Sequence, residues 1–279
     1  MTNVATRKQQ DRLFAANRAV GRAALRVDVA RGVTCRTDVA EAGSLRLRFP
    51  NADAGELEAV VVNIAGGVAG GDHLQFDIAV GEGARLTLTS AAAEKVYRSL
   101  GPDSAIDVKL KVAAGGVLRW LPQETILFDR ARMARIIEVD LAADARLLMV
   151  EALVFGRSAM GETVEQGRLF DRWRVRRNGR LVYADTMRLE GAIAARLVEP
   201  AAAHGAVAMA TVLKAPGDDA TVAAVRALGD SLRGEVGISA WNGNALARLV
   251  AADGAILRHD LAMVLSTLHA GPLPRLWVN

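Results

Sequence analysis

The sequence has very little of the residue types on which disulfide-stabilised proteins and metalloenzymes depend. Among its 279 residues there is one cysteine, Cys35, which excludes an internal disulfide and suits a reducing compartment. We expect Cys35 to be a packed small hydrophobe, because no histidine lies near it in the sequence. The four histidines form no H-x-H or H-x-x-x-H pair, so a tight nitrogen or sulfur metal site is not expected.

Long apolar runs are also lacking. No stretch of about 18 residues is free of charged side chains, so no membrane span is expected. Residues 1–22 are polar and basic and contain no apolar core of a signal peptide. We therefore predict a cytoplasmic protein in which residues 1–19 form a flexible N-terminal segment.

The net charge is +4 and comes almost entirely from arginine. Five arginines between Arg172 and Arg180 could indicate nucleic-acid binding. However, three of them alternate with Trp173 and Val175, which is typical of a strand with one solvated or partner-facing side. No zinc-finger, helix-turn-helix or RNA-binding aromatic signature accompanies them, so no nucleic-acid partner is expected. Aromatic residues make up 4% of the chain, which disfavours a β-sandwich module that binds carbohydrate or peptide through exposed rings.

From about residue 20 to 190 the sequence consists of short alternating runs. Residues 74–80 and 106–112 show this clearly, with apolar side chains at every second position. Glycine-containing segments at 81–83, 114–116 and 178–179 would reverse the chain between such runs. Strands at this spacing are typical of a β sandwich, a barrel or a stacked β solenoid.

Helical periodicity occurs only near the C-terminal end, at residues 218–232 and 254–268. Asp218 or Asp219 would cap the first helix. Between the helices, residues 237–250 are typical of a hairpin with an Asn-Gly-Asn turn. Since no linker or low-complexity segment is found, we predict that residues 20–279 form one mainly β domain with a small helical part.

The segment Asn63–Asp72, NIAGGVAGGD, contains two glycine pairs. A phosphate-binding loop would need a lysine and a following helix, but there is no lysine and a strand is expected from His73. Glycines permit positive φ and close backbone contact. We expect a packed loop that fixes Asp72, because the residues between the glycines are apolar; a flexible hairpin tip is the alternative. The four glycines are Gly66, Gly67, Gly70 and Gly71.

Two other segments carry carboxylates. Glu94 follows three alanines and precedes two cations, and an ordinary surface charge cluster is the simplest interpretation. Glu151 interrupts the apolar run 147–155, which would be buried on both faces. A buried carboxylate requires a partner, Arg157 for example, so structural pairing and a functional role both remain open.

No nucleophile–base–acid set can be recognised, and no G-x-S-x-G motif occurs. A small-molecule enzyme remains as an alternative, with Asp72 and Glu151 as an acid–base pair.

Five motifs occur together, and in this combination the sequence resembles the urease accessory protein UreD family, called UreH in some organisms. The resemblance covers about residues 20–277; at Gly43-Ser44-Leu45 the family usually has Gly-Pro-Leu, which leaves the conformation of that turn open. The motifs are NIAGGVAGGD at Asn63–Asp72, EKVYRS at Glu94–Ser99, WLPQETILF at Trp120–Phe128, GRSAMGE at Gly156–Glu162 and LPRLW at Leu273–Trp277.

The resemblance implies a fold of stacked, partly solenoid-like β strands with two helices near the C-terminus. It implies a non-enzymatic scaffold in urease maturation that binds apo-urease together with UreF-type and UreG-type accessory proteins. It further implies that nickel passes through the protein in transit, with no permanently bound cofactor.

A transfer path must release Ni²⁺, and scattered carboxylates suit this better than a histidine or cysteine cage. We expect Asp72, Glu151 and Asp185 to line a transient nickel passage, with His73 as a weaker candidate. For partner contact we expect Arg275 and Trp277 in the C-terminal tail. The alternative for Trp277 is that it packs the tail onto the core.

Overall fold

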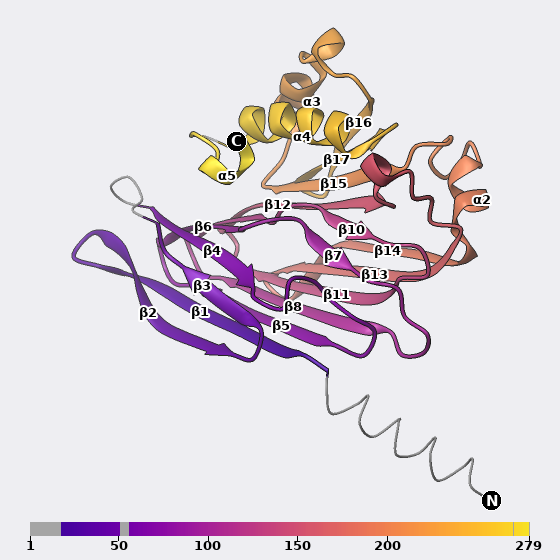
Figure 1. The fold of residues 1–279 in the computed structure, drawn as a ribbon. Helices are drawn as coiled ribbons and strands as arrows, with labels where there is room; N and C mark the ends of the chain where they lie inside the picture. Colours follow the sequence, from indigo (N-terminus) through magenta and orange to yellow (C-terminus); the bar gives the residue numbers. More distant parts are fainter. Residues whose placement is uncertain (1–17, 51–55, 270, 279) are drawn as a thin grey trace, which may run out of the picture.

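Two β sheets lie face to face in the computed structural model, which describes residues 18–50, 56–269 and 271–278 (Figure 1). The predicted segment 1–19 falls almost wholly outside the described residues. The first sheet has the strand order β14 (Arg180–Ala192), β13 (Gln166–Arg177), β11 (Arg132–Leu141), β8 (Ser104–Val112), β5 (His73–Val80), β1 (Val20–Ala30) and β2 (Val33–Ala42). The second has the order β16 (Glu235–Trp241), β17 (Asn244–Ala251), β15 (Ala208–Ala215), β12 (Arg146–Phe155), β9 (Val117–Leu121), β6 (Arg85–Ser90), β4 (Leu57–Asn63) and β3 (Leu45–Arg48), with β10 (Thr125–Leu127) and β7 (Glu94–Val96) attached beside this path.

The chain coils between the two sheets. Strands β5, β8, β11 and β13 pair in parallel in the first sheet, and β4, β6 and β9 pair in parallel in the second, where β9 also pairs with β12. From β4 to β13 the chain passes back and forth between the sheets, so each circuit adds one long strand to each sheet, while β7 and β10 are short additions to the second. The prediction of stacked, solenoid-like strands is therefore confirmed.

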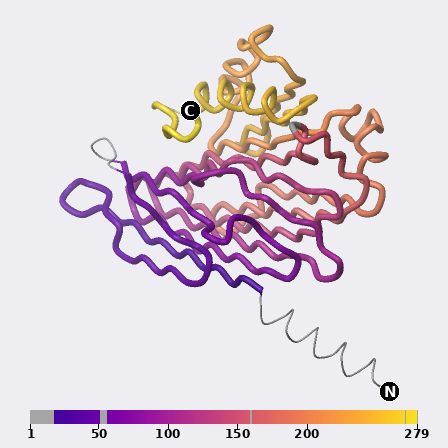
Figure 2. The backbone as a smooth tube through the Cα atoms, in the orientation of Figure 1, coloured from indigo at the N-terminus to yellow at the C-terminus, as the bar shows by residue number. Residues whose placement is uncertain are grey.

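In each circuit the chain crosses from the first sheet to the second at one end of the strands and returns at the other end. The predicted reversals at 81–83, 114–116 and 178–179 lie at one end, with Gly83, Gly115 and Gly179 at positive φ. Segments 63–72, 97–103, 128–131 and 156–165 connect strands at the opposite end. We call these four segments the arcs, and this end the glycine-loop end. The tube in Figure 2 shows the coil.

Alternating side chains build the main core between the sheets. Strand β5 alternates strictly, with Leu74, Phe76, Ile78 and Val80 buried, as the sequence predicts. A second core lies on the other face of the second sheet, under the helices at the upper side of Figure 1. It joins residues of β12, β15 and β17 to those of α3 (Asp219–Arg226), α4 (Gly254–Leu268) and α5 (Arg275–Val278).

The helices partly follow the prediction. Helix α4 has the predicted bounds, and Asp253 caps it by accepting from the Ile256 amide. Helix α3 is shorter than the predicted 218–232, because the chain turns into a short 3-10 segment at Gly229, which has positive φ. Helices α5 and α2 (Ile193–Val198) were not predicted, since four and six residues are too few to show a helical period.

The expectation that Cys35 is packed is wrong, because its side chain is exposed. Strand β2 is the edge of the first sheet and is exposed at nearly every position, so alternation there does not lead to burial. Within the described residues, no helix has both the length and the apolar character needed to cross a membrane.

Candidate functional site

A buried cluster of charged side chains lies between the two sheets. Arg135 on β11 and Asp171 on β13 face each other in register in the first sheet, and Glu151 comes from β12 in the second. All three are buried, with Arg135 at 3% exposure. Its Nε donates to Asp171 Oδ1 over 3.2 Å, and its two terminal nitrogens donate to Glu151 and Asp171. One guanidinium thus bridges carboxylates from both sheets.

Two indoles complete the cluster. Trp120 Nε1 donates to Glu151 Oε1 over 2.8 Å, and Trp173 Nε1 donates to Asp171 Oδ1 over 3.2 Å. Burial raises the pKa of Glu151, and the charge of Arg135 only partly opposes this. For Arg135 burial lowers the pKa, but the two carboxylates outweigh burial and raise it. The cluster thus places two carboxyl groups around a single guanidinium in the core.

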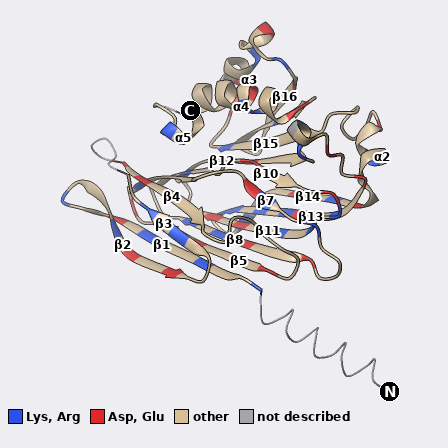
Figure 3. Cartoon of the chain, viewed as in Figure 1, with Lys and Arg blue, Asp and Glu red and all other residues tan. Residues whose placement is uncertain are grey.

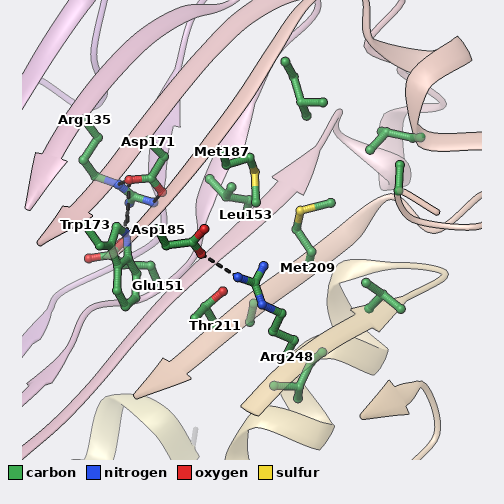
Figure 4. Close-up of a pocket in the computed structure, with 16 residues that line it drawn as sticks. Arg135, Glu151, Leu153, Asp171, Trp173, Asp185, Met187, Met209, Thr211 and Arg248 are labelled. Carbon is green, nitrogen blue, oxygen red and sulfur yellow. Dashed lines mark hydrogen bonds and ion pairs between the residues drawn. The ribbon is translucent and has the colours of Figure 1, made fainter. Parts of the chain in front are cut away.

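Two cavities meet at this cluster. The first, of about 200 Å³, is lined by Arg135, Glu151, Asp171 and Asp185 together with apolar side chains such as Met187 and Met209 (Figure 4). The second, of about 70 Å³, lies among Phe76, Trp120 and neighbours. Arg135 and Glu151 are the two residues common to both linings. The ion cluster therefore forms the boundary between the cavities.

At the first cavity, Asp185 on β14 joins the two sheets near the surface. Its Oδ2 accepts from Arg248 Nη2 on β17 over 2.6 Å (Figure 4), and also from the Tyr183 hydroxyl over 3.0 Å. The Arg248 side chain is 53% exposed, so this part of the cavity wall reaches solvent. Burial raises the pKa of Tyr183, which keeps its hydroxyl protonated as a donor.

At the second cavity, the polar lining includes Glu94 on β7. Asn63 Nδ2 donates to both carboxylate oxygens of Glu94 over 3.1 and 3.2 Å. Burial raises the pKa of Glu94 to about 7, and the hydrogen bond from Asn63 only partly offsets it. The interpretation of Glu94 as an ordinary surface charge is therefore wrong. The three alanines before it were no signal for this setting, because Ala91 and Ala92 are exposed and do not enclose the carboxylate.

The glycine loop holds Asp72 without bringing it to either cavity. Asp72 is 5% exposed; its Oδ1 accepts from the Ala19 amide over 2.8 Å and its Oδ2 from the Ala69 amide over 2.7 Å. His73 lies on the half-exposed outer side of β5, where its Nε2 is 2.7 Å from Asp107 Oδ2. Neither Asp72 nor His73 is among the residues that line the two cavities.

The structure thus brings Glu151 and Asp185 to one cavity and separates both from Asp72. An acid–base pair of Asp72 and Glu151 would need both carboxylates at one substrate, which this arrangement does not provide. Arg157 is not the partner of Glu151. It binds Glu162 on the same arc, with Nε 2.8 Å from Oε2, while Arg135 from the opposite sheet pairs with Glu151.

In the C-terminal tail, Trp277 is 3% exposed and packs against the protein's own core. Its Nε1 donates to the Leu121 carbonyl over 2.9 Å, and the Arg258 guanidinium lies 5.4 Å from its ring centre. Arg275 is exposed. A partner could contact Arg275 directly, but it could reach the Trp277 indole only by displacing the tail.

Sequence reasoning missed Arg135 and Asp171, although a signal was present. Arg135 alternates with Met133 and Ile137, and Asp171 shares the face of Trp173, so both belong to core-facing positions of their strands. In the described part of the chain, no group of three or more His, Cys, Asp or Glu side chains is arranged to hold a metal ion.

Comparison with known proteins identifies the family. The family model described as UreD urease accessory protein matches residues 19–278. The chain belongs to the UreD family. Among its relatives, the urease accessory protein UreD of Rhodopseudomonas palustris strain HaA2 is 55% identical over 279 residues, covering both chains in full. UreD of strain ATCC BAA-98 / CGA009 is 56% identical over 266 residues, or 95% of each chain, and UreD of Bradyrhizobium diazoefficiens is 53% identical over 267 residues, or 96% of each.

Membership confirms the family resemblance that the five sequence motifs indicate. This chain is a urease accessory protein. Four of the five motifs lie at or beside the glycine-loop end of the coil. Two lie in the arcs 63–72 and 156–165, and the other two contain the short strands β7 and β10.

Proposed function

We propose that this UreD chain is a non-catalytic cytoplasmic scaffold that binds apo-urease with UreF-type and UreG-type accessory proteins and lets Ni²⁺ pass through it to the urease active site. The observation that carries the proposal is the pair of cavities that share Arg135 and Glu151. They extend from Asp185 near the surface, past the ion cluster, to Glu94 on the opposite side of the cluster.

The chemistry of this route suits a metal ion in transit. Glu151 and Asp171 supply carboxyl oxygens that a passing divalent cation can bind. Arg135 already occupies both carboxylates, so a passing ion competes with a guanidinium and is held weakly. A site of this kind favours release over storage. Asp72 and His73 have no place on this route; we assign Asp72 the role of fixing the glycine loop.

Glu151→Gln tests the route. The substitution keeps the side-chain size and the hydrogen-bond acceptor for Trp120 but removes one of the two carboxylates at the boundary. We expect nickel per urease to fall several-fold in cells that co-express the urease subunits and the accessory proteins, measured by atomic absorption on purified urease. Asp185→Asn should lower it less, because Asp185 lies where the cavity wall reaches solvent.

The control is Glu235→Gln, an exposed carboxylate at the start of edge strand β16. Complex formation is scored in parallel by co-purification, because a scaffold that no longer binds urease would also deliver less nickel. Full nickel loading with Glu151→Gln in an intact complex would contradict the route. Catalytic turnover of a small molecule by the purified chain would contradict the non-catalytic role.

A further inference from the structure

The arcs at the glycine-loop end carry large apolar side chains that the fold leaves in solvent. Leu100 is 85% exposed, Met160 74%, Ile64 59% and Tyr97 36%. Single exposed apolar residues are normal on protein surfaces, but a set on neighbouring arcs at one end of a coil is not a random scatter. We call these four side chains, together with the nearby Lys95 and Arg98, the glycine-loop patch.

The arcs that carry the patch touch one another. The Tyr97 amide donates to the Val68 carbonyl over 2.9 Å, and the Ser99 amide donates to the Arg130 carbonyl over 3.0 Å. The rings of Tyr97 and Phe128 meet edge to face at 5.1 Å, and the Arg157 guanidinium lies 4.3 Å from the Phe128 ring centre. The first arc thus contacts the second, the second the third, and the third the fourth.

Two members of the patch, Tyr97 and Leu100, are held in place by hydrogen bonds. The Tyr97 hydroxyl donates to the Gly66 carbonyl over 2.8 Å, and a side chain on Gly67 would collide with the Tyr97 ring. Ser99 Oγ donates to the Pro102 carbonyl over 2.7 Å and accepts from the Gly101 amide over 3.2 Å, which fixes the turn that presents Leu100. The ordered turn gains no stability from Leu100, because this side chain is not buried within the chain. A pre-ordered apolar surface does reduce the entropy lost when a partner binds.

The charge of the patch is positive. Four of the five carboxylates of the arcs are engaged within the chain: Asp103 with Arg132, Asp129 with Arg130, Glu162 with Arg157, and Asp72 with backbone amides. The fifth, Glu165, is exposed at the end of the fourth arc. Among the described residues, the exposed side chains of Lys95 and Arg98 form no ion pair. Figure 3 shows where basic and acidic residues lie along the chain. A partner surface that complements the patch therefore carries apolar side chains next to aspartate or glutamate.

Backbone pairing does not explain the patch. The amides of Val68, Tyr97 and Ser99 already donate to carbonyls within the chain, so no free strand edge is available there for an added strand. Recognition must come from side chains, as it does when an amphipathic helix places its apolar face on a complementary surface. Tyrosine and arginine at the patch are residue types enriched among energetically dominant interface residues.

We propose that the glycine-loop patch is a docking surface for an acidic amphipathic helix of another protein. The inference rests on the proposed function in that the helix belongs to a component of urease maturation. The patch adjoins the second cavity through one short strand, β7, which contributes Glu94 to the cavity and continues into Lys95 and Tyr97. A partner bound here lies beside one end of the route.

The test uses the full chain with the urease subunits, the UreF-type protein and the UreG-type protein, each tagged separately. Leu100→Asp and Arg98→Glu change the patch, and Leu181→Asp and Arg180→Glu make the same changes at exposed positions of the opposite end. Thermal unfolding checks that all four variants fold. Binding of each component is then measured at about 50 and 300 mM salt, where higher salt screens charge pairs.

We expect both patch variants to weaken binding of the same component at least tenfold, while the two controls stay within twofold of the wild type. Wild-type binding of that component should weaken at the higher salt concentration. Unchanged binding of all components by folded patch variants would overturn the inference. So would a wild-type homodimer that only the patch variants dissociate, because the occupant would then be a second copy of this chain.

The two proposals fail in different ways. If Glu151→Gln lowers the nickel content of urease while the patch variants bind normally, the docking surface is wrong and the route stands. If the wild-type chain neither binds a component nor raises urease nickel, the proposed function is wrong, and the docking inference falls with it.

Discussion

At the scale of single residues, Glu94 holds its carboxyl group in a setting that opposes ionisation. Burial raises its pKa from the ordinary value to about 7, although Asn63 donates to both of its oxygens. The folded chain therefore keeps this proton up to about pH 7, whereas the unfolded chain releases it near the ordinary glutamate value. Because the folded state binds more protons in this interval, the free energy of unfolding falls as the pH rises through it.

Glu94→Gln should remove this dependence, because glutamine resembles the neutral acid and does not titrate. Between pH 5 and 8 the wild type should lose about 2–3 kcal/mol of stability relative to the variant. Urea unfolding at the two pH values measures the difference. Glu235→Gln, at an exposed position, should follow the wild type, and parallel profiles for wild type and Glu94→Gln would refute the argument.

Arg135 shows the limit of sequence reasoning for single residues. The sequence establishes that Glu151 needs a partner, because an unpaired buried carboxylate costs several kcal/mol. It does not identify that partner. Arg157 is close in sequence, but the guanidinium that binds Glu151 comes from another strand of the opposite sheet. Pairing across sheets depends on which strands face each other, and alternation within one strand contains no such information.

At the scale of elements, the glycine loop shows why glycine is required at particular positions. Gly67 has φ 149°, and a Cβ there would lie 2.8 Å from the Lys95 carbonyl oxygen and closer still to the Tyr97 ring. Gly101, on the next arc, has no atom within 4 Å of where its Cβ would be. The two positions separate the effect of crowding from that of removing a glycine from an arc.

Gly67→Ala should therefore destabilise the protein by about 1–3 kcal/mol, through backbone strain and the collision with Tyr97. Gly101→Ala should change stability by less than about 0.5 kcal/mol. Chemical unfolding of both variants at one pH provides the comparison. Equal stability of the two would show that the loop adapts and is not tightly packed.

Local pattern predicts most elements of this chain. Strict alternation predicts β5 and β8, and the bounds of α4 follow from its periodicity. The short helices α2 and α5 lack enough residues for a period, and α3 ends early because a glycine with positive φ follows it. Exposure of Cys35 was not predictable from alternation, because that pattern does not say that β2 is a sheet edge.

At the scale of the whole molecule, two cores share the second sheet. Leu147 and Leu148 are neighbours on β12 and point to opposite faces, Leu147 into the core between the sheets and Leu148 into the core under the helices. Strand β12 is thus part of both cores, and loss of either core exposes it. We expect this sharing to make residues 20–279 unfold as one unit, as the single-domain prediction requires.

Leu147→Ala and Leu148→Ala test this. Each should cost about 2–5 kcal/mol, the usual range for a buried leucine. Calorimetry should show one transition that both variants shift to lower temperature. Two transitions, with each variant shifting a different one, would instead mean that the helical part and the coil unfold separately, and the single-domain prediction would be wrong.

The exposed Cys35 also makes this chain convenient to label. It is the single thiol of the sequence, and it lies on β2 near the hairpin tip at Arg31 and Gly32, at the end of the coil away from the arcs. A maleimide fluorophore or spin label would attach at one known place without any added cysteine. The label would sit far from the glycine-loop patch, so complex formation could be followed in solution with the probe outside the proposed contact.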